Sequence, residues 1–326
     1  MNAAPDCPIC SAPNVHTVQE ISSTQAAAWF CPKERNADRH DRLVRSIEHL
    51  WSQRSCLMMH CQACDFLFAF PYIAGDEAFY SILHEQSGYP TFRWEYRIVA
   101  DYLAANNTIK RVLDVGAGSG SFLALLGPGF TRFATESTET NRRLLERQGI
   151  GTFANFRDFQ TRDGDRADIV TMFQVIEHIA DARPFLEETH DSLKPGGIVA
   201  ISTPDAPSQM RKQSLVPEFD VPPNHVSIYS AQSLHSLLKQ SGFDPEITLN
   251  EPPGLESFKR ALVYRLRSRS RQAKASLAKL CSNISNQRLR HVALTGSLLF
   301  DVPWLAFNWR LASRSNNLLV VARRRS

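Results

Sequence analysis

The chain has 326 residues, of which 43% are hydrophobic and 21% are charged, and its formal net charge is +4. These values are close to globular averages and exclude a disordered chain or a fibrous repeat. The length allows one core of normal size plus a small accessory unit, since domains usually contain roughly 100–200 residues.

The first residues and the cysteine content predict a cytoplasmic protein. Met1–Cys10 has neither a cationic start nor an apolar run, so no secretory signal peptide is expected. The apolar segment Leu298–Leu311 is interrupted by polar residues and is shorter than the roughly 20 apolar residues of a spanning helix. The odd number of cysteines, seven, favours metal ligation in a reducing compartment over a disulfide framework.

Residues 1–74 are predicted to form a cysteine-rich, zinc-ribbon-like module. Its two Cys-x-x-Cys pairs offer four thiolates for a tetrahedral structural zinc site, and they are Cys7/Cys10 and Cys61/Cys64. The pairs lie farther apart than in an ordinary ribbon, so the charged stretch Lys33–Arg54 is predicted to be a helical insert between two metal-binding hairpins. Cys31 and Cys56 are spare thiols that could replace a ligand. Isolated buried thiols and redox chemistry are the alternatives.

Residues 75–105 are predicted to be a helical bridge into the next domain. The stretch is rich in aromatic residues but shows no strand alternation, and Trp94–Leu103 has apolar residues at helical spacing.

Residues 106–326 are predicted to form a doubly wound α/β domain, because short apolar runs alternate with amphipathic stretches. Seven strands are expected, at Arg111–Val115, Thr131–Thr135, Thr152–Asn155, Asp168–Phe173, Ile198–Ser202, Glu246–Leu249 and Leu318–Ala322. Helices are expected at Ser121–Leu126, Glu139–Gln148, Ala182–Ser192 and Ala231–Gln240, the last behind the N-cap Ser230. A helical insert at about 255–315 separates the last two strands.

A glycine-rich turn follows the first predicted strand of this domain. Gly116, Gly118 and Gly120 allow φ > 0 and let a ligand approach bare main chain. Glu136 ends the next strand, where a carboxylate can accept hydrogen bonds from ribose hydroxyls. Only one residue separates Gly118 from Gly120, whereas the nicotinamide-binding fingerprint has two at this point. That spacing disfavours a dinucleotide, and a tight turn with glycines present only for packing is the alternative to a binding site.

The run Val112–Leu123 resembles motif I of class I S-adenosylmethionine-dependent methyltransferases. Three later segments resemble motifs of the same superfamily, and they are Asp168–Ile179, Leu193–Gly197 and Ile201–Asp205. The resemblance covers roughly residues 108–250 and the final strand, and it implies a seven-stranded, mostly parallel sheet whose last strand is antiparallel. It also implies S-adenosylmethionine as cofactor, with these residues holding it or lying near it: Asp114, Gly116, Gly118, Gly120, Glu136, Phe173 and Gln174.

Polar side chains follow the fourth predicted strand, where ligands of open α/β sheets bind. The segment containing Gln174, Glu177 and His178 resembles the ubiquinone-biosynthesis type of O-methyltransferase, in which a Glu-x-x-Glu-His motif is implicated in metal binding. Here Gln174 replaces the first acid, and an amide is a poorer ligand for a hard cation. Metal-assisted catalysis and a bracing role for Glu177 and His178 are therefore both open.

Two histidines are the candidates for a general base, since histidine titrates near neutral pH. They are His178 and His225, and the segment around His225, Pro222–Ser230, resembles the substrate-side segment of the same family. A hydrogen-bonded structural role is the alternative for His225.

The predicted insert has ten basic residues and no acid between Ser257 and Phe300, followed by an apolar cluster. Three interpretations are open: a lid over an apolar or anionic substrate, an amphipathic surface that contacts a membrane, and a helical hairpin packed on the sheet.

Taken together, the sequence predicts an enzyme that transfers a methyl group from S-adenosylmethionine to an oxygen of a small-molecule or saccharide-type acceptor, with a nitrogen or carbon acceptor as the less favoured alternative. The cysteine module followed by Phe66–Tyr72 resembles methyltransferases that carry a zinc ribbon before the catalytic domain. No nucleic-acid partner is expected, because no basic and aromatic residues interleave beside the cysteines. The alternatives are a non-catalytic scaffold with this fold and a methyltransferase acting on RNA or protein. The sequence predicts no oligomeric state.

Overall fold

The computed structural model describes residues 5–86, 93–162, 166–206, 221–252 and 317–325. The predicted insert at 255–315 lies outside the described residues, and so do the three interpretations of it. The described residues up to 206, from 221 to 249 and from 317 onward belong to one compact unit. The predicted division of the chain at residues 74 and 105 stays a prediction.

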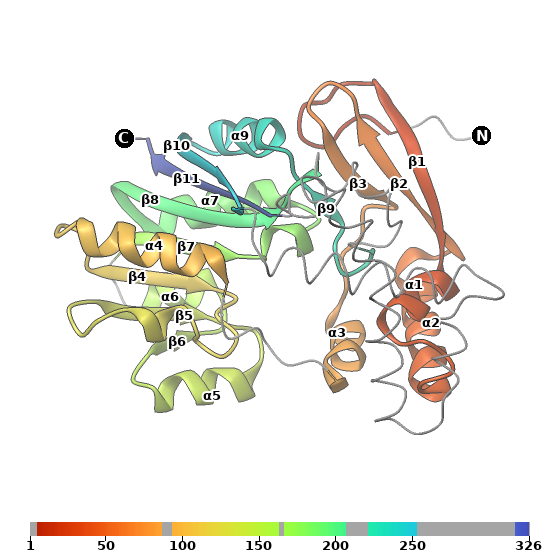
Figure 1. Cartoon of the computed structure of the whole chain (residues 1–326), viewed down its shortest axis with the longest axis horizontal. Coiled ribbons are helices and arrows are strands. Elements are labelled where there is room, and N and C mark those ends of the chain that lie inside the picture. The colour runs from red at the N-terminus through yellow and green to blue at the C-terminus, as the bar shows by residue number, and fades with distance from the viewer. Residues whose placement is uncertain (1–4, 87–92, 163–165, 207–220, 253–316, 326) are drawn as a thin grey trace, which may run out of the picture. The chain divides into compact units, whose positions relative to one another are not determined.

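Two sheets and the helices around them make up this unit (Figure 1). The strands are β1 (Val15–Ser22), β2 (Ser55–Cys61), β3 (Phe66–Phe70), β4 (Arg111–Val115), β5 (Thr131–Thr135), β6 (Gly151–Phe153), β7 (Ala167–Phe173), β8 (Leu193–Pro204), β9 (Ser227–Ile228), β10 (Phe243–Asn250) and β11 (Asn317–Arg324). The α-helices are α1 (Ser23–Phe30), α2 (Ala37–Trp51), α3 (Glu77–Leu83), α4 (Trp94–Ala105), α5 (Glu139–Arg147), α6 (Phe156–Arg162), α7 (Ala182–Ser192) and α9 (Ala231–Gln240). Short 3₁₀ turns are η1 (His84–Gln86), η2 (Leu123–Leu125) and η3 (Ile176–His178).

The larger sheet has seven strands in the order β10-β11-β8-β7-β4-β5-β6. Strands β6, β5, β4, β7 and β8 are parallel to one another, whereas β11 is antiparallel to β8, with Leu319 opposite Ser202. The predicted mostly parallel sheet with an antiparallel last strand is therefore confirmed.

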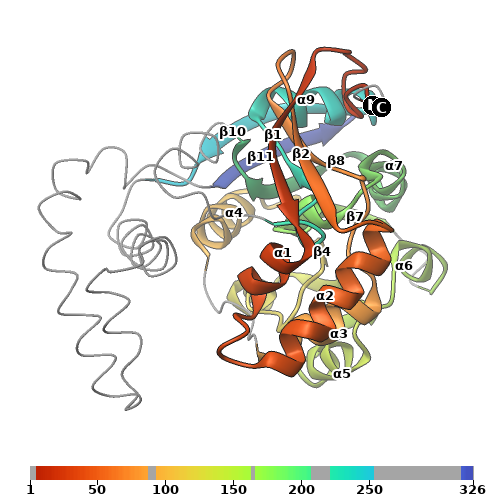
Figure 2. The ribbon, with the colours of Figure 1, turned by 90° about the vertical axis from the view of Figure 1, so that its right-hand side faces the viewer.

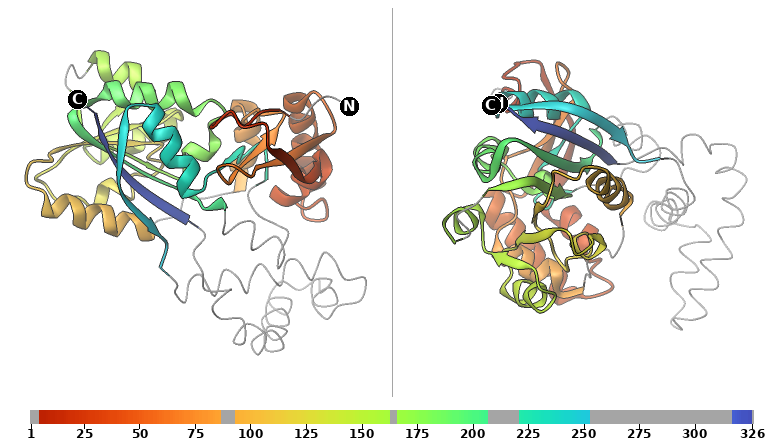
Figure 3. Two further views of the ribbon diagram at one scale, coloured as in Figure 1. Left: turned by 90° about the horizontal axis from the view of Figure 1, so that it is seen from above. Right: turned by 90° about the vertical axis from the view of Figure 1, so that its left-hand side faces the viewer.

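Alternating residues of the central strands enter two different cores, as expected for a sheet covered on both faces. On one face Val112 and Ile169 pack with Leu103 of α4, and on the other Leu113 and Val170 pack with residues of α6, α7 and α9. Figure 3 shows α4 on one side of the sheet and α6 and α7 on the other. This arrangement confirms the doubly wound fold.

Most predicted helices of this domain form at the predicted residues. Helix α9 begins behind Ser230, whose hydroxyl accepts from the Ser233 N–H at 3.0 Å. The helix predicted at Ser121–Leu126 is wrong, because only the 3₁₀ turn η2 forms there. The sequence Gly127-Pro128-Gly129 ends it after one turn.

The smaller sheet has the order β1-β2-β3-β9, and all of its described strand pairs are antiparallel. Figure 2 shows β1 and β2 beside α1 and α2. Helix α2 lies within the predicted helical insert, whereas α1 was not predicted. The capping box formed by Ser22 and Gln25 was the available signal for α1.

None of the described helices is both long and apolar enough to cross a bilayer.

Candidate functional site

The glycine turn follows β4 at the carboxyl end of the large sheet. Gly116, Gly118 and Gly120 have φ values of 65°, 55° and 79°, so the predicted left-handed conformation is confirmed. A Cβ atom at Gly116 would lie 2.9 Å from Val175 Cγ2, and one at Gly120 would lie 2.6 Å from Leu145 Cδ2. A side chain at either position would therefore have to displace a packed neighbour and adopt a strained, left-handed conformation. Contact of the turn with a cofactor stays a prediction.

Glu136 lies beneath this turn, immediately after β5, and is 6% exposed. The N–H of Gly118 donates to Oε2 of Glu136 at 3.0 Å, and the N–H of Thr138 donates to Oε1 at 3.0 Å. A carboxylate can accept about four hydrogen bonds. Glu136 therefore anchors the turn and retains acceptor capacity for hydroxyl donors of a ligand.

Asp114, in β4, is 3% exposed. Its Oδ1 accepts from the Thr171 hydroxyl at 2.7 Å. Burial raises the pKa of Asp114 to about 7 despite this bond. The carboxyl is thus held in an apolar setting, where a nearby cation would stabilise its charged form. Its predicted role in cofactor binding is not tested by this geometry.

Phe173 ends β7 next to the turn, and Gln174 follows it. The Phe173 ring packs 4.8 Å from that of Phe122 and 4.9 Å from that of Tyr96, measured between centroids. Gln174 has φ 59°, and its N–H donates to the carbonyl of Ser202 at 2.9 Å. Such a conformation of a residue other than glycine costs on the order of 1–3 kcal/mol and is concentrated at functional sites.

A group of three ionisable side chains follows Gln174. Atoms of Glu177, His178 and His225 that could bind a metal lie within 4.8 Å of one another. The rings of His178 and His225 are 4.6 Å apart between centroids at an angle of 77°. Glu177 is fully buried and the two histidines are half-buried. The structure thus brings together both predicted candidates for a base.

Long-range contacts hold the loop that carries His225. The N–H of Ala69 donates to the carbonyl of Val226 at 2.9 Å, beside the pairing of β3 with β9. On the other side, the N–H of Val226 donates to the carbonyl of Glu177 at 3.0 Å. The loop is therefore fixed between the small sheet and the end of β7.

Tyr80 of α3 also reaches this site, which sequence reasoning missed. Its hydroxyl lies 3.1 Å from Nδ1 of His178 and 3.4 Å from the carbonyl oxygen of Asn224. The same His178 Nδ1 is 2.6 Å from the Asn224 carbonyl oxygen. Tyr80 and His178 are 98 positions apart in sequence, so no local pattern could have indicated their contact.

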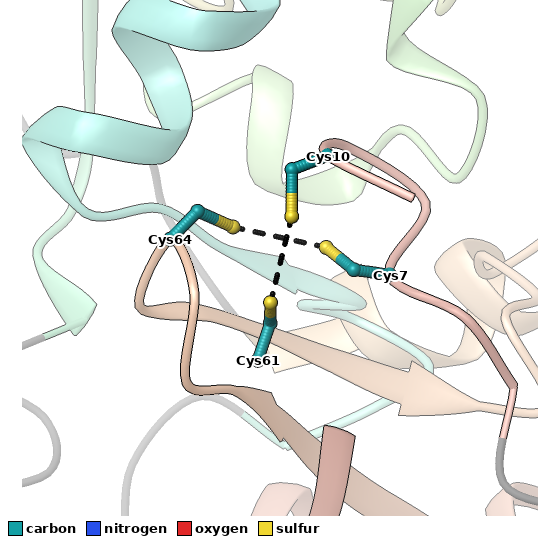
Figure 4. A group of neighbouring side chains, drawn as sticks. All are labelled: Cys7, Cys10, Cys61 and Cys64. Carbon is teal, nitrogen blue, oxygen red and sulfur yellow. Dashed lines mark hydrogen bonds between the residues drawn. The ribbon is translucent and has the colours of Figure 1, made fainter. Parts of the chain in front are cut away.

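The four cysteines of the two Cys-x-x-Cys pairs meet at one point (Figure 4). The Sγ atoms of Cys7 and Cys64 are 3.7 Å apart, and those of Cys10 and Cys61 are 3.6 Å apart. Zn–S bonds of about 2.3 Å place the sulfurs of a tetrahedral site ~3.8 Å apart, whereas a disulfide requires about 2.05 Å. The geometry therefore fits four thiolates around one zinc ion.

The electrostatics of the cluster favour at least one thiolate. The contact with the Cys64 thiol lowers the pKa of Cys7 to about 5. The spare thiol Cys56 lies outside the cluster, and burial raises its pKa to about 12. Cys31 is likewise outside the cluster and fully buried. Neither spare thiol replaces a predicted ligand in this structure.

Comparison with known proteins identifies the larger domain. Residues 92–246 match the family model described as "Methyltransferase domain". A protein of Mycolicibacterium smegmatis named as a probable S-adenosylmethionine-dependent methyltransferase is 29% identical over 160 residues, which cover 47% of this chain and 60% of that protein. The ubiquinone biosynthesis O-methyltransferase of Ruegeria pomeroyi is 32% identical over 104 residues, covering 28% of this chain and 40% of that enzyme.

The matched segments thus span only about half the length of these relatives. Among solved structures, a SAM-dependent methyltransferase from Archaeoglobus fulgidus aligns with 71% of this chain and 93% of its own, at 18% identity and a TM-score of 0.43. The sequence matches agree with the seven-stranded sheet and with the motifs at the ends of its strands. Residues 92–246 of this chain are therefore a methyltransferase domain.

Proposed function

We propose that this protein transfers a methyl group from S-adenosylmethionine to an oxygen of a small-molecule or saccharide-type acceptor. The observation that carries the proposal is the left-handed glycine turn with buried Glu136 beneath it, at the carboxyl end of a methyltransferase-type sheet. Several relatives are named as O-methyltransferases of ubiquinone biosynthesis, which supports an oxygen acceptor.

The residues around the turn fit the cofactor's chemistry. The left-handed turn carries no side chain at Gly118, where a ligand could lie against the main chain, and Glu136 would accept from ribose hydroxyls. The buried carboxyl of Asp114 would favour a cationic ligand bound beside it. When bound, S-adenosylmethionine supplies a methyl group on a positively charged sulfur, which an acceptor oxygen displaces in line. Most of the protein's contribution is then positioning of the two reactants.

On the acceptor side, His178 or His225 would take up the proton that the hydroxyl loses. Their rings are adjacent. His178 lies in η3, just after β7, and His225 lies in the loop before β9. Buried Glu177 places a carboxylate next to them, which would stabilise an imidazolium. The same three side chains could ligate a divalent cation, but Gln174 offers only an amide at the remaining family position. We therefore favour proton transfer by histidine.

We also propose a structural zinc ion at Cys7, Cys10, Cys61 and Cys64. The sulfur separations and burial support it. Such an ion stabilises the folded state, because the unfolded chain has no preformed site to bind it.

Calorimetric titration of the metal-quantified protein with S-adenosylmethionine and S-adenosylhomocysteine tests the cofactor proposal. Gly118→Arg should abolish binding, since it puts a large side chain at a left-handed position of the turn. Gly196→Arg is the matched control, because Gly196 also has positive φ but its Cβ would meet open space. Absence of binding by the folded, zinc-loaded wild-type protein would contradict the proposal and favour a scaffold role.

The acceptor-side proposal is tested by screening hydroxylated small molecules for methylation. If His225 is the base, His225→Gln should lower the turnover of any acceptor found by roughly 100-fold, the lower end of the usual range for loss of a general base, whereas His178→Gln should do so if His178 is the base. Turnover equal to wild type would show that His225 has a structural role only.

A further inference from the structure

The ring of His178 makes one contact that determines which of its nitrogens carries hydrogen. Its Nδ1 lies 2.6 Å from the main-chain carbonyl oxygen of Asn224. A carbonyl oxygen only accepts hydrogen bonds, so a neutral imidazole must donate an N–H from Nδ1 at this distance. The opposite tautomer would place two lone pairs in contact. The remaining lone pair of the neutral ring is therefore on Nε2.

Tyr80 supports this arrangement from α3. Its hydroxyl donates to the same Asn224 carbonyl oxygen at 3.4 Å, and its oxygen lies 3.1 Å from Nδ1 of His178, where it accepts from the Nδ1–H. A carbonyl oxygen has two lone pairs and can accept both donors. Burial raises the pKa of the Tyr80 phenol, so the hydroxyl remains a donor at neutral pH. The Tyr80 ring also packs edge-on against His178, with centroids 6.1 Å apart.

The position of the carbonyl is fixed in turn by the chain on either side of it. The N–H of Gly75 donates to the carbonyl of Pro223 at 2.9 Å, and Val226 pairs with Glu177 as described above. Gly75 has a packing reason to be glycine, because a Cβ there would lie 2.5 Å from the ring of Phe79 and 3.1 Å from that of Tyr80. The segment that leads from the small sheet into α3 thus holds both Tyr80 and the Asn224 loop.

We propose that Tyr80 and the Asn224 carbonyl are positioning groups that hold His178 as the Nδ1-protonated tautomer, so that Nε2 accepts the proton of the methyl acceptor. The catalytic part of this inference rests on the proposed function, whereas the tautomer assignment does not. Tyr80 acts through His178 and the Asn224 loop, as groups that fix histidine tautomers in other active sites do.

Nitrogen NMR of the full-length, zinc-loaded protein with ¹⁵N-labelled histidine tests the assignment. Spectra are recorded at a pH where His178 is neutral, and the signals lost in His178→Gln are assigned to this residue. The expected pattern has a protonated Nδ1 and an unprotonated Nε2. A wild-type His178 that is predominantly protonated at Nε2 would overturn the proposal.

Tyr80→Phe keeps the ring and removes the hydroxyl. We expect the ratio of the two tautomers to fall by about fivefold, the change that loss of one ordinary hydrogen bond produces. Tyr72→Phe is the matched control, because the Tyr72 hydroxyl bonds to Ser227 Oγ at 2.5 Å and not to His178. A Tyr80→Phe spectrum identical to wild type would overturn the role of Tyr80, and so would an equal change in Tyr72→Phe.

Titration of the same variants with S-adenosylhomocysteine separates this inference from the proposed function. Tyr80→Phe should bind the ligand as tightly as wild type, since Tyr80 touches the acceptor side only. With an acceptor in hand, Tyr80→Phe should lower kcat by less than the fivefold change in the tautomer ratio and leave KM unchanged, because the reactive tautomer remains the major one. Failure of the wild-type protein to bind the ligand would contradict the proposed function but leave the tautomer assignment standing.

Discussion

The cofactor side and the acceptor side of the candidate site are built in different ways. The cofactor side consists of one turn and the acid that follows it, with Gly118 and Glu136 only 18 positions apart. The acceptor side is assembled from three distant segments, α3, η3 and the loop before β9. The cofactor side therefore depends on local backbone conformation, whereas the acceptor side depends on how the small sheet packs.

The small sheet is part of the acceptor side, because it holds the loop that carries His225. Strand β9 belongs to the segment that carries His225 but pairs with β3. The cysteine hairpin also contacts α9: the carbonyl of Cys64 accepts from Ser230 Oγ at 2.7 Å, and that of Ala63 accepts from Gln232 Nε2 at 2.9 Å. Damage to the cysteine cluster should therefore reach His225 before it reaches the glycine turn.

Loss of the zinc site should have the largest effect. Cys61→Ser is expected to remove the metal and to destabilise the small sheet by many kcal/mol, because structural zinc contributes on the order of 10–16 kcal/mol in peptide sites. Hydrogen exchange should show lost protection in β3, β9 and the loop before β9. Binding of S-adenosylhomocysteine should change by less than about threefold if the two sides are independent.

Cys56→Ala is the control for this experiment, since Cys56 is buried in the same strand but lies outside the cluster. It should keep the full zinc content and cost about 1–2 kcal/mol of stability, within the usual range for point mutants. Equal loss of protection at the glycine turn and at β9 in Cys61→Ser would break the distinction between the two sides.

Asp114 is expected to make stability depend on pH through the cofactor side. Its folded pKa of about 7 lies above the ordinary 3.8, so the folded state binds the proton more tightly than the unfolded state does. The free energy of unfolding should therefore fall as pH rises from about 4 to 7 and level off above that, by at most about 4 kcal/mol.

Asp114→Asn should remove most of this slope, because the amide cannot ionise and its oxygen can still accept from Thr171. Denaturant unfolding at several pH values measures it, and the variant should exceed wild type in stability at about pH 8. The same substitution should weaken binding of S-adenosylmethionine, whose sulfur is cationic. A wild-type protein with equal stability at about pH 5 and 8 would contradict the predicted linkage.

Gly120→Ala tests the close packing of the turn. The added Cβ would lie 2.6 Å from Leu145 in a conformation with φ 79°. We expect the affinity for S-adenosylhomocysteine to fall by about 100-fold. The energetic cost of a left-handed alanine and the cost of displacing Leu145 both distort the turn. Gly149→Ala is the control, because Gly149 has φ 73° and open space around its Cβ. It should lose stability but keep its affinity for the ligand.

The sequence predicted the cofactor side of the site better than the acceptor side. The strands β4 and β5 appear at the predicted residues because each is a short apolar run that ends in a turn signal. Helix α9 was predictable from the N-cap Ser230 and its apolar spacing. The glycine turn and Glu136 could be recognised because they are close in sequence and their residue types are dictated by conformation.

The acceptor side could be predicted only in part. His178 and His225 were named, but not the groups that hold them. Strand β9 has two residues, and its pairing of Ile228 with Leu67 joins segments that no periodicity connects. Helix α6 has seven residues and was missed for a similar reason, since short helices carry little periodic signal.

Glu136→Gln should have the smallest effect and sharpens the account of the cofactor side. The amide oxygen can still accept a hydrogen bond from the N–H of either Gly118 or Thr138. The NH₂ group would then face the other N–H, to which it cannot bond. We expect the affinity for S-adenosylhomocysteine to fall by about tenfold, which corresponds to one hydrogen bond to a charged group. Calorimetry measures this change directly.

The neighbouring Glu139→Gln is the matched control, because Glu139 is exposed and pairs only with Arg143 among the described residues. An affinity loss in Glu136→Gln but not in Glu139→Gln would tie binding to the acid beneath the turn and not to the general charge of this edge. If both variants bound as wild type while Gly120→Ala lost affinity, the turn would hold the ligand by its backbone alone. Glu136 would then serve only to anchor the Gly118 amide, and the cofactor side would depend on local conformation even more strongly than its geometry already indicates.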